Sequence, residues 1–226
     1  MTESPNLTRP HWQRLRRMYR SAGWPCLDAI ELDLLAAGLL ERIPSATGPD
    51  TLRVTDAGIA GLAGQRQQHQ QALTTHQQCI LRVAEHLHAQ NRVCFSEISL
   101  RAKPGERWLQ VRPDLYSIRK TTRAAYLEPV IHEIKVRRSD LLGDLKRPDK
   151  RAAYQALATR FYYVLGENVG DAADIPDDCG VLRCTANRLE LLREAPPRAA
   201  EVSFASWMAL AKATPLRTQP EPPPEL

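Results

Sequence analysis

Two apolar stretches, residues 108–118 (WLQVRPDLYSI) and 126–136 (YLEPVIHEIKV), decide the fold that the sequence predicts. Both are rich in β-branched and aromatic residues, which favour β-strands. Further strands and helices are expected nearby, at residues 76–89, 92–100, 149–159, 160–165, 180–184 and 188–192. A turn containing Ser139, Asp140 and Gly143 is expected after the second stretch. This order of helices and strands predicts an α/β domain.

Charged residues interrupt both stretches in a pattern that suggests a reactive site. Residues two apart in a strand project to the same face, so Glu133 and Lys135 should point together while Ile134 points to the other side. If Asp114 comes from the adjacent strand, two carboxylates and one ammonium group meet. Carboxylate oxygens are ligands suited to Mg²⁺, which polarises phosphoryl oxygens and lowers the pKa of bound water. The ammonium group can stabilise the charge that develops on a phosphate.

Each of these charged residues also has a structural interpretation. Asp114 follows a proline and can cap a turn. Glu133 and Lys135 can form a weak ion pair on a solvent-facing strand. The run 130–136 is otherwise apolar, however, and charges on a buried strand need partners or a metal. We expect His132 to be a structural histidine of this strand.

The order of the motifs resembles the PD-(D/E)XK nuclease superfamily over roughly residues 72–193. The sequence is also similar to the MmcB-like group of bacterial DNA-repair proteins, in the stretches SEISL…RPDLYSI…VIHEIKVRRSDLLGDLK…AAYQALATRFYYVLG. The resemblance implies a restriction-endonuclease-like mixed central sheet flanked by helices. It also implies a deoxyribonuclease that uses Mg²⁺ or Mn²⁺ and acts in DNA repair or in the processing of foreign or mobile DNA.

Carried over residue by residue, the resemblance makes Asp114 and Glu133 metal ligands and Lys135 the catalytic lysine. The family also uses an upstream acid, for which this chain offers Glu85 and Glu97. Ile80 marks the apolar face of the predicted helix. At about 100° per residue, Glu85 lies about 140° away from Ile80 and so points away from that face. We therefore prefer Glu97 as the third metal ligand of the catalytic site. The residues that match the supporting positions of the group are Asp140, Asp144 and Tyr154.

The charge of the chain permits a nucleic-acid partner. Its 31 Lys and Arg exceed its 26 Asp and Glu by five. The excess is local, because residues 101–160 hold 15 Lys and Arg against seven Asp and Glu. Phosphate contacts from such residues give salt-sensitive affinity with little reading of sequence. We expect DNA contacts from Arg119, Lys120, Arg123, Arg137, Arg138, Lys146, Arg147 and Lys150.

Residues 1–66 follow a different pattern of helix, turn, helix, hairpin and helix. The stretch LLAAGLLERI…TLRVTDAGIAGL resembles the last part of a winged helix-turn-helix domain. Gly23 is expected to end the first helix, and the hydroxyl of Thr55 to cap the last short one. The span holds eight Lys and Arg and seven Asp and Glu. DNA contact through this module and a dimerisation or protein-docking role therefore both stay open.

Three segments are expected along the chain, at residues 1–66, 72–198 and 199–226. The polar run 67–71 (QQHQQ) should separate the first two, and the third should hold a helix at 202–212 and a proline-rich tail from Arg217. The five cysteines include no CxxC pair and are read as reduced thiols of a cytoplasmic protein. No run of 18 apolar residues occurs, so no membrane partner is expected. The histidines expected on the solvent side of their helix are His76, His86 and His88.

We therefore expect a Mg²⁺-dependent deoxyribonuclease domain preceded by a small winged-helix domain. The alternative, from another functional class, is a non-catalytic DNA-binding or docking subunit that keeps the nuclease-like fold. A metal-binding measurement separates the two, because only the first needs a divalent ion.

Overall fold

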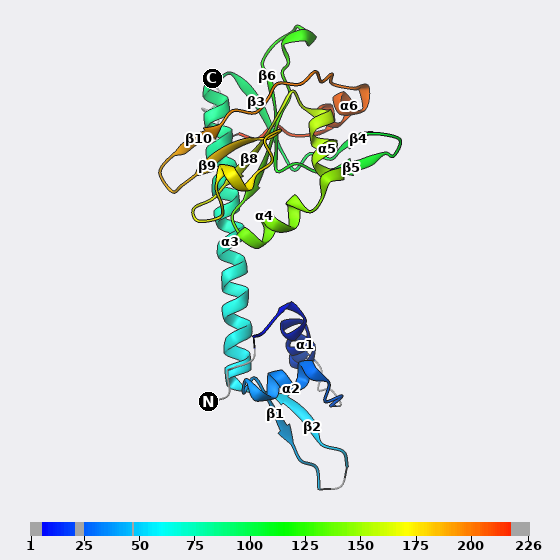
Figure 1. The fold of residues 1–226 in the computed structure, drawn as a ribbon, viewed down its shortest axis with the longest axis vertical. Helices are drawn as coiled ribbons and strands as arrows, with labels where there is room; N and C mark the ends of the chain where they lie inside the picture. The colour runs from blue at the N-terminus through cyan, green and yellow to red at the C-terminus, as the bar shows by residue number, and fades with distance from the viewer. Residues whose placement is uncertain (1–5, 21–24, 47, 218–226) are drawn as a thin grey trace, which may run out of the picture. The chain divides into compact units, whose positions relative to one another are not determined.

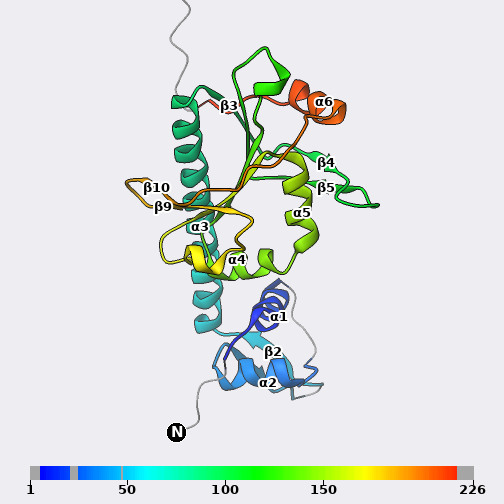
Figure 2. The same cartoon turned by 45° about the horizontal axis from the view of Figure 1, so that its top comes forward.

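The computed structural model of the chain describes residues 6–20, 25–46 and 48–217. The chain divides into two compact units, Met1–Gln71 and Ala72–Leu226, which are drawn in Figures 1 and 2. The predicted end of the first helix at Gly23 lies outside the described residues, as do residues 218–226 of the tail that is predicted from Arg217.

The first unit has the predicted order of elements. Its members are α1 (Arg9–Arg20), α2 (Ala29–Ala36), the antiparallel pair β1 (Leu40–Ile43) and β2 (Thr51–Val54), and the start of α3 (Asp56–Ala89). A small core forms around the buried side chains of Leu15 and Leu34. The Thr55 hydroxyl accepts a hydrogen bond from the Gly58 N–H at 3.1 Å, which confirms the predicted helix cap.

Helix α3 is one continuous element, so the prediction of two helices separated by residues 67–71 is wrong. The run QQHQQ is polar, but glutamine has a good helix propensity and costs the helix little. No glycine or proline occurs between residues 65 and 89 to break it. The polar side chains of this run therefore face solvent and do not end the helix.

The second unit is built on a mixed six-stranded sheet, as Figure 1 shows. Its strands, in spatial order, are β10 (Leu189–Arg193), β9 (Gly180–Cys184), β8 (Arg160–Leu165), β7 (Val130–Lys135), β6 (Leu115–Arg119) and β3 (Arg92–Ser96). The pairs β7–β8 and β8–β9 are parallel, and the other three pairs are antiparallel. The predicted α/β class with a mixed central sheet flanked by helices is confirmed.

Two of the predicted long strands are interrupted. Residues 108–118 form β5 (Leu109–Val111) and β6, separated by Arg112-Pro113-Asp114. A proline has no N–H for the strand ladder, which explains the break. Within the predicted strand 92–100, β3 ends at Ser96, because Glu97 has a φ of 52°, outside the range of a strand. Glu97 therefore lies just after β3, before β4 (Leu100–Ala102), which pairs with β5 in a separate hairpin.

Beside α3, the described part of the second unit has three α-helices, α4 (Arg138–Leu145), α5 (Pro148–Leu157) and α6 (Phe204–Lys212). Two short 3-10 helices, η1 (Ala124–Tyr126) and η2 (Ala172–Asp174), complete it. The predicted turn around Gly143 is wrong, because these residues lie within α4. One glycine costs a helix only about 1 kcal/mol relative to alanine, and the fully buried Leu141 anchors the helix on the core. Pro148 begins α5 at a position where proline is favoured.

The sheet is covered on both faces. Figures 1 and 2 show α3 along one face, and α5, α6 and the β4–β5 hairpin on the other. Alternation along β7 sends Ile134 into the core with Ile80 of α3, and Ile131 into the core with Tyr154 of α5. Glu133 is two residues from Ile131, so it lies on the α5 side. Among the described residues, no helix has both the length and the apolar character needed to cross a lipid bilayer.

Candidate active site

The strand register brings Asp114 and Glu133 to the same end of the sheet. Leu115 of β6 pairs with His132 of β7, so Asp114, one residue earlier, lies opposite Glu133. The Asp114 Oδ2 atom accepts a hydrogen bond from the Ile134 N–H at 2.7 Å, which fixes this carboxylate at the strand end. Lys135 follows on the same face of β7 as Glu133.

Glu133 lies at the centre of a buried ionic cluster, with 3% of its surface exposed. Its Oε1 atom accepts hydrogen bonds from Lys135 Nζ at 2.7 Å and from Lys150 Nζ at 2.6 Å. Lys150 Nζ also donates to Asp144 Oδ1 at 2.6 Å, and the Tyr163 hydroxyl donates to Asp144 Oδ2 at 2.9 Å. Two carboxylates and two ammonium groups thus balance one another away from water.

Lys135 and Asp144 of this cluster stay charged near neutral pH. Burial lowers the pKa of Lys135, but the negative charges of Glu133 and Asp144 outweigh it and raise the pKa above the ordinary value. Burial raises the pKa of Asp144, but the ammonium groups of Lys135 and Lys150 outweigh it and lower the pKa. Lys135 is therefore a fixed positive charge rather than a proton acceptor.

Two of the carboxylates suit a divalent cation. Among the described residues, the buried Glu133 Oε2 atom has no hydrogen-bond partner. Such an unpaired oxygen is costly in a protein interior, and a cation beside it would remove that cost. Asp114 supplies a second carboxylate from the opposite strand position, and oxygen ligands of this kind match Mg²⁺ or Mn²⁺.

Glu97, the predicted third ligand, is placed differently. Its carboxylate accepts a hydrogen bond from Arg112 Nη2 at 2.7 Å, and 65% of its side chain is exposed. In the ranges that the structure describes, no three His, Cys, Asp or Glu side chains form a group able to hold a metal. Its role as a ligand stays a prediction, and it would require the carboxylate to leave Arg112.

His76 of α3 reaches the site and was missed by the sequence reasoning. Its Nε2 atom lies 3.3 Å from Asp114 Oδ2, and this contact raises the pKa of the imidazole above its ordinary 6.5. The prediction that His76 faces solvent is wrong, since the side chain is half-buried. The signal was present in the sequence, because His76 precedes Ile80 by four residues and Val83 by seven and so shares their helix face.

The supporting residues are distributed between the cluster and the surface. Asp144 belongs to the cluster, as described above. The Tyr154 hydroxyl donates to the Arg112 carbonyl at 3.1 Å, and the Lys150 ammonium lies 5.2 Å from its ring centroid. Asp140 is exposed in the first turn of α4. Tyr154 therefore ties α5 to the segment that carries Asp114.

Several of the basic residues predicted to contact DNA have partners within the chain. Arg119 pairs with Glu128 at 2.9 Å, and Arg123 lies 5.3 Å from the ring centroid of Tyr126. Arg138 donates to both oxygens of Asp174, at 3.0 and 3.2 Å, and lowers the pKa of that carboxyl to about 2. Arg137 immediately precedes α4 and is partly buried.

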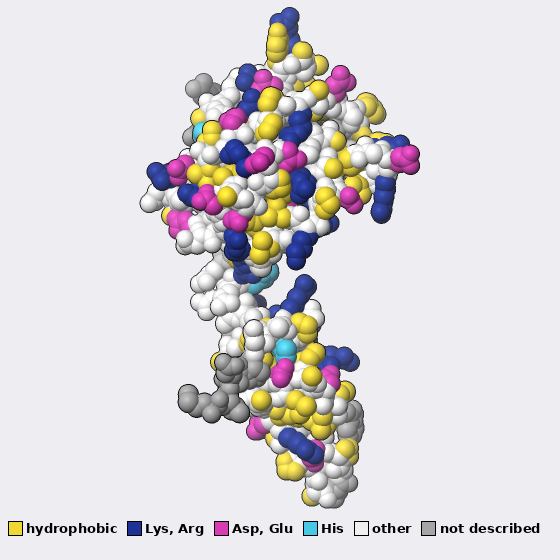
Figure 3. All heavy atoms as spheres, in the orientation of Figure 1, with side chains coloured by type: hydrophobic (Ala, Val, Ile, Leu, Met, Phe, Trp, Pro, Cys, Tyr) yellow, Lys and Arg dark blue, Asp and Glu magenta, His cyan; other side chains and the backbone are white. Residues whose placement is uncertain are grey.

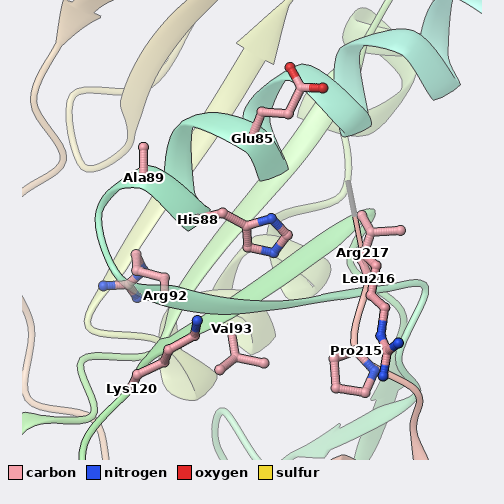
Figure 4. Close-up of a pocket in the computed structure, with 9 residues that line it drawn as sticks. All are labelled: Glu85, His88, Ala89, Arg92, Val93, Lys120, Pro215, Leu216 and Arg217. Atoms are coloured by element: carbon pink, nitrogen blue, oxygen red, sulfur yellow. The ribbon is translucent and has the colours of Figure 1, made fainter. Parts of the chain in front are cut away.

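A cavity of about 560 Å³ lies between the end of α3, strand β3 and residues 215–217, as Figure 4 shows. Lys120, which was predicted to contact DNA, lines it. Arg92 also lines it, with its Nε atom donating to Ser117 Oγ at 3.0 Å. None of Asp114, Glu133 and Lys135 belongs to its lining. This cavity is thus separate from the ionic cluster.

A second cavity, of about 540 Å³, lies beside the cluster and is called the basic groove below. It is lined by the continuous segments Leu109–Arg112 and Lys146–Lys150. Lys150 belongs both to the groove and to the cluster, where it binds Glu133 and Asp144. The remaining residues predicted to contact DNA, Lys146 and Arg147, line the same groove.

Comparison with known proteins gives little beyond this geometry. The sequence matches no protein-family model. No curated protein matches it either. A solved structure of a protein of unknown function from Silicibacter pomeroyi is similar, with 22% sequence identity and a TM-score of 0.46. That match covers 61% of this chain and 82% of the other.

Proposed function

We propose that the chain is a metal-dependent nuclease of the PD-(D/E)XK kind, similar to the MmcB-like group, that hydrolyses phosphodiester bonds in DNA. Its setting would be DNA repair or the processing of foreign or mobile DNA in the cytoplasm. The observation that carries the proposal is the buried Glu133 carboxylate. One of its oxygens binds two ammonium groups, and the other is unpaired on the strand position opposite Asp114.

Asp114 and Glu133 would hold Mg²⁺ or Mn²⁺. When bound, such an ion lowers the pKa of a coordinated water and polarises the phosphate. Lys135 keeps its proton, because Glu133 and Asp144 overcome the effect of its burial. Its ammonium group is therefore available to stabilise charge on the phosphate. Lys150 holds Glu133 and Asp144 in place through hydrogen bonds of 2.6 Å to each.

A non-catalytic DNA-binding or docking subunit is the second candidate, and one observation favours it. The two ammonium groups on Glu133 Oε1 already balance the charge of this carboxylate within the chain. An ion network of this kind can serve the fold alone. In that case the cluster would bind no divalent ion.

For the N-terminal unit we propose docking to a protein partner or to a second copy of the chain. Helix α1 carries a cluster of arginines, Arg14, Arg16, Arg17 and Arg20, which is where this unit could contact phosphates. Arg14 pairs with Asp28 at 2.7 Å and with Glu31, and the contact with Asp28 raises its pKa. An arginine held by two carboxylates of its own unit is a poor phosphate ligand.

Calorimetric titration with Mn²⁺ tests the nuclease proposal. We expect wild type to bind the ion, and Asp114→Asn to bind it at least about tenfold more weakly, the scale for losing a group that tunes a metal site. Asp177→Asn is a matched control, because Asp177 is fully exposed and pairs with Arg193. Equal affinity in wild type and Asp114→Asn would place the ion elsewhere. Absence of binding in wild type would favour the non-catalytic candidate.

A further inference from the structure

The basic groove carries a strong local excess of positive charge. Four cationic side chains line it, Arg112, Lys146, Arg147 and Lys150, against the single carboxylate of Asp149. Lys146 and Arg147 are exposed, and neither side chain has an ion pair or hydrogen bond with another described residue. Arg112 binds Glu97, and Lys150 binds Glu133 and Asp144, so Lys146 and Arg147 supply the positive charge that is left for an anionic ligand.

The backbone adds to this charge. Helix α5 begins at Pro148, and both Pro148 and Asp149 line the groove. Pro148 has no N–H, so the N–H groups of this first turn come from Asp149 and Lys150. Such groups lack intrahelical partners and carry partial positive charge, which favours phosphate oxygens. Lys150, one residue further on, binds Glu133 at 2.6 Å. A ligand in the groove would therefore lie directly beside the ionic cluster.

An exposed tryptophan stands next to the groove. Trp108 immediately precedes Leu109 of the groove wall, and 56% of its surface is exposed. The Arg101 guanidinium lies 5.2 Å from its ring centroid. Both residues belong to the β4–β5 hairpin, which Figure 1 draws projecting from the unit. In Figure 3 the tip of this hairpin carries both basic and acidic side chains. An exposed aromatic ring with an arginine beside it is suited to stacking with a nucleic-acid base.

We propose that the basic groove binds an unpaired strand of DNA, with a base stacked on Trp108 and its phosphates on Lys146 and Arg147. This inference rests on the proposed function and names its substrate class, DNA with a single-stranded segment. A base in a duplex has neighbours on both faces, so only an unpaired base offers a face to Trp108. The groove would then lead the strand to Asp114 and Glu133.

Fluorescence anisotropy with labelled single-stranded and duplex DNA of equal length tests this inference. The measurement uses EDTA, so that neither metal binding nor cleavage enters the result. We expect Trp108→Ala to weaken single-strand binding by roughly tenfold or more, the scale for one stacked base. Its duplex affinity should not change. Trp207→Ala is the matched control, because Trp207 of α6 is 42% exposed and lies outside the groove lining.

A salt series tests the phosphate contacts. Loss of two contacts to a single strand should lower the slope of log affinity against log salt by about 1.4 in Lys146→Ala/Arg147→Ala. Arg188→Ala/Lys212→Ala removes the same charge outside the groove lining and should keep the wild-type slope.

The two proposals fail in different ways. If Trp108→Ala binds single strands as tightly as wild type, or if wild type prefers duplex DNA, the inference about the groove is wrong and the nuclease proposal is untouched. If Mn²⁺ fails to bind while single-strand binding and its loss in Trp108→Ala hold, the nuclease proposal is wrong and the groove is supported. If wild type binds no DNA in EDTA, the inference about the groove is wrong.

Discussion

The imidazole of His76 ends 3.3 Å from the Asp114 carboxylate, and this contact makes a residue-scale prediction. We expect an NMR titration of wild type to give His76 a pKa above 6.5, because Asp114 stabilises the imidazolium form. In Asp114→Asn the pKa should fall, since burial and the Lys135 charge both oppose protonation. Asp177→Asn should leave it unchanged. A His76 pKa that is the same in Asp114→Asn would contradict the contact.

His132 lies on the other face of β7, and its pKa is lowered, whereas that of His76 is raised. The His132 ring stacks on Tyr162 with centroids 5.3 Å apart, and among the described residues its buried Nδ1 atom has no partner. Burial lowers the pKa of this imidazole to about 3. In the unfolded chain the group titrates near 6.5. The stability that neutral His132 contributes is therefore present above about pH 6.5 and is lost as the pH falls from there toward 3.

Acid should thus destabilise wild type through His132. The free energy of unfolding should lose up to about 1.4 kcal/mol per pH unit within that window from this group. His132→Phe removes the titrating group and should show a smaller loss between about pH 7 and about pH 5 in urea unfolding. The control His69→Phe changes an exposed histidine of α3 that does not act on His132, and it should follow wild type. An identical loss in His132→Phe would show that another group causes it.

The candidate site was only partly predictable at this scale. The period of two along residues 130–136 correctly placed Glu133 and Lys135 on one face, because strand geometry is local. The pairing of Lys150 with Glu133 depends on how α5 packs on β7, which the sequence does not reveal. Glu97 has a positive φ and contacts Arg112, and no sequence pattern indicated either feature.

At the scale of elements, apolar runs predicted strands well where nothing interrupts them. The predicted strands 160–165 and 180–184 match β8 and β9. Interruptions within a strand were harder to predict, because one proline or one residue with positive φ divides an apolar run and hardly changes its composition. Helix α3 shows the converse, since a polar run of glutamines continues a helix when no breaker is present.

Gly143 offers a test of helix α4. A β-carbon added there meets no atom within 4 Å, so alanine should fit. We expect Gly143→Ala to raise the free energy of unfolding by about 0.4–1 kcal/mol, because alanine lowers the entropy of the unfolded chain. Gly105→Ala should instead destabilise, since Gly105 has a φ of +142°. Thermal unfolding measures both, and a lower melting temperature for Gly143→Ala would contradict the helical assignment.

For the whole molecule, net charge is a poor guide to where a ligand binds. The chain has a net charge of +5, yet Arg14, Arg119 and Arg138 are paired with acids of their own unit. The charge without partners that bears on the proposals lies in the basic groove, beside Lys150. The surface in Figure 3 accordingly mixes both signs over much of the second unit.

The most direct test of the central claim is single-turnover cleavage of labelled DNA with a single-stranded segment, in Mg²⁺ or Mn²⁺, by wild type and Lys135→Met. Wild type should cleave, and Lys135→Met should be slower by a factor on the order of 10² or more, because one fixed charge beside the phosphate is lost. Mn²⁺ binding should persist, and Lys212→Met should cleave like wild type. Equal cleavage by Lys135→Met, or none by a wild type that binds this DNA, would contradict the claim.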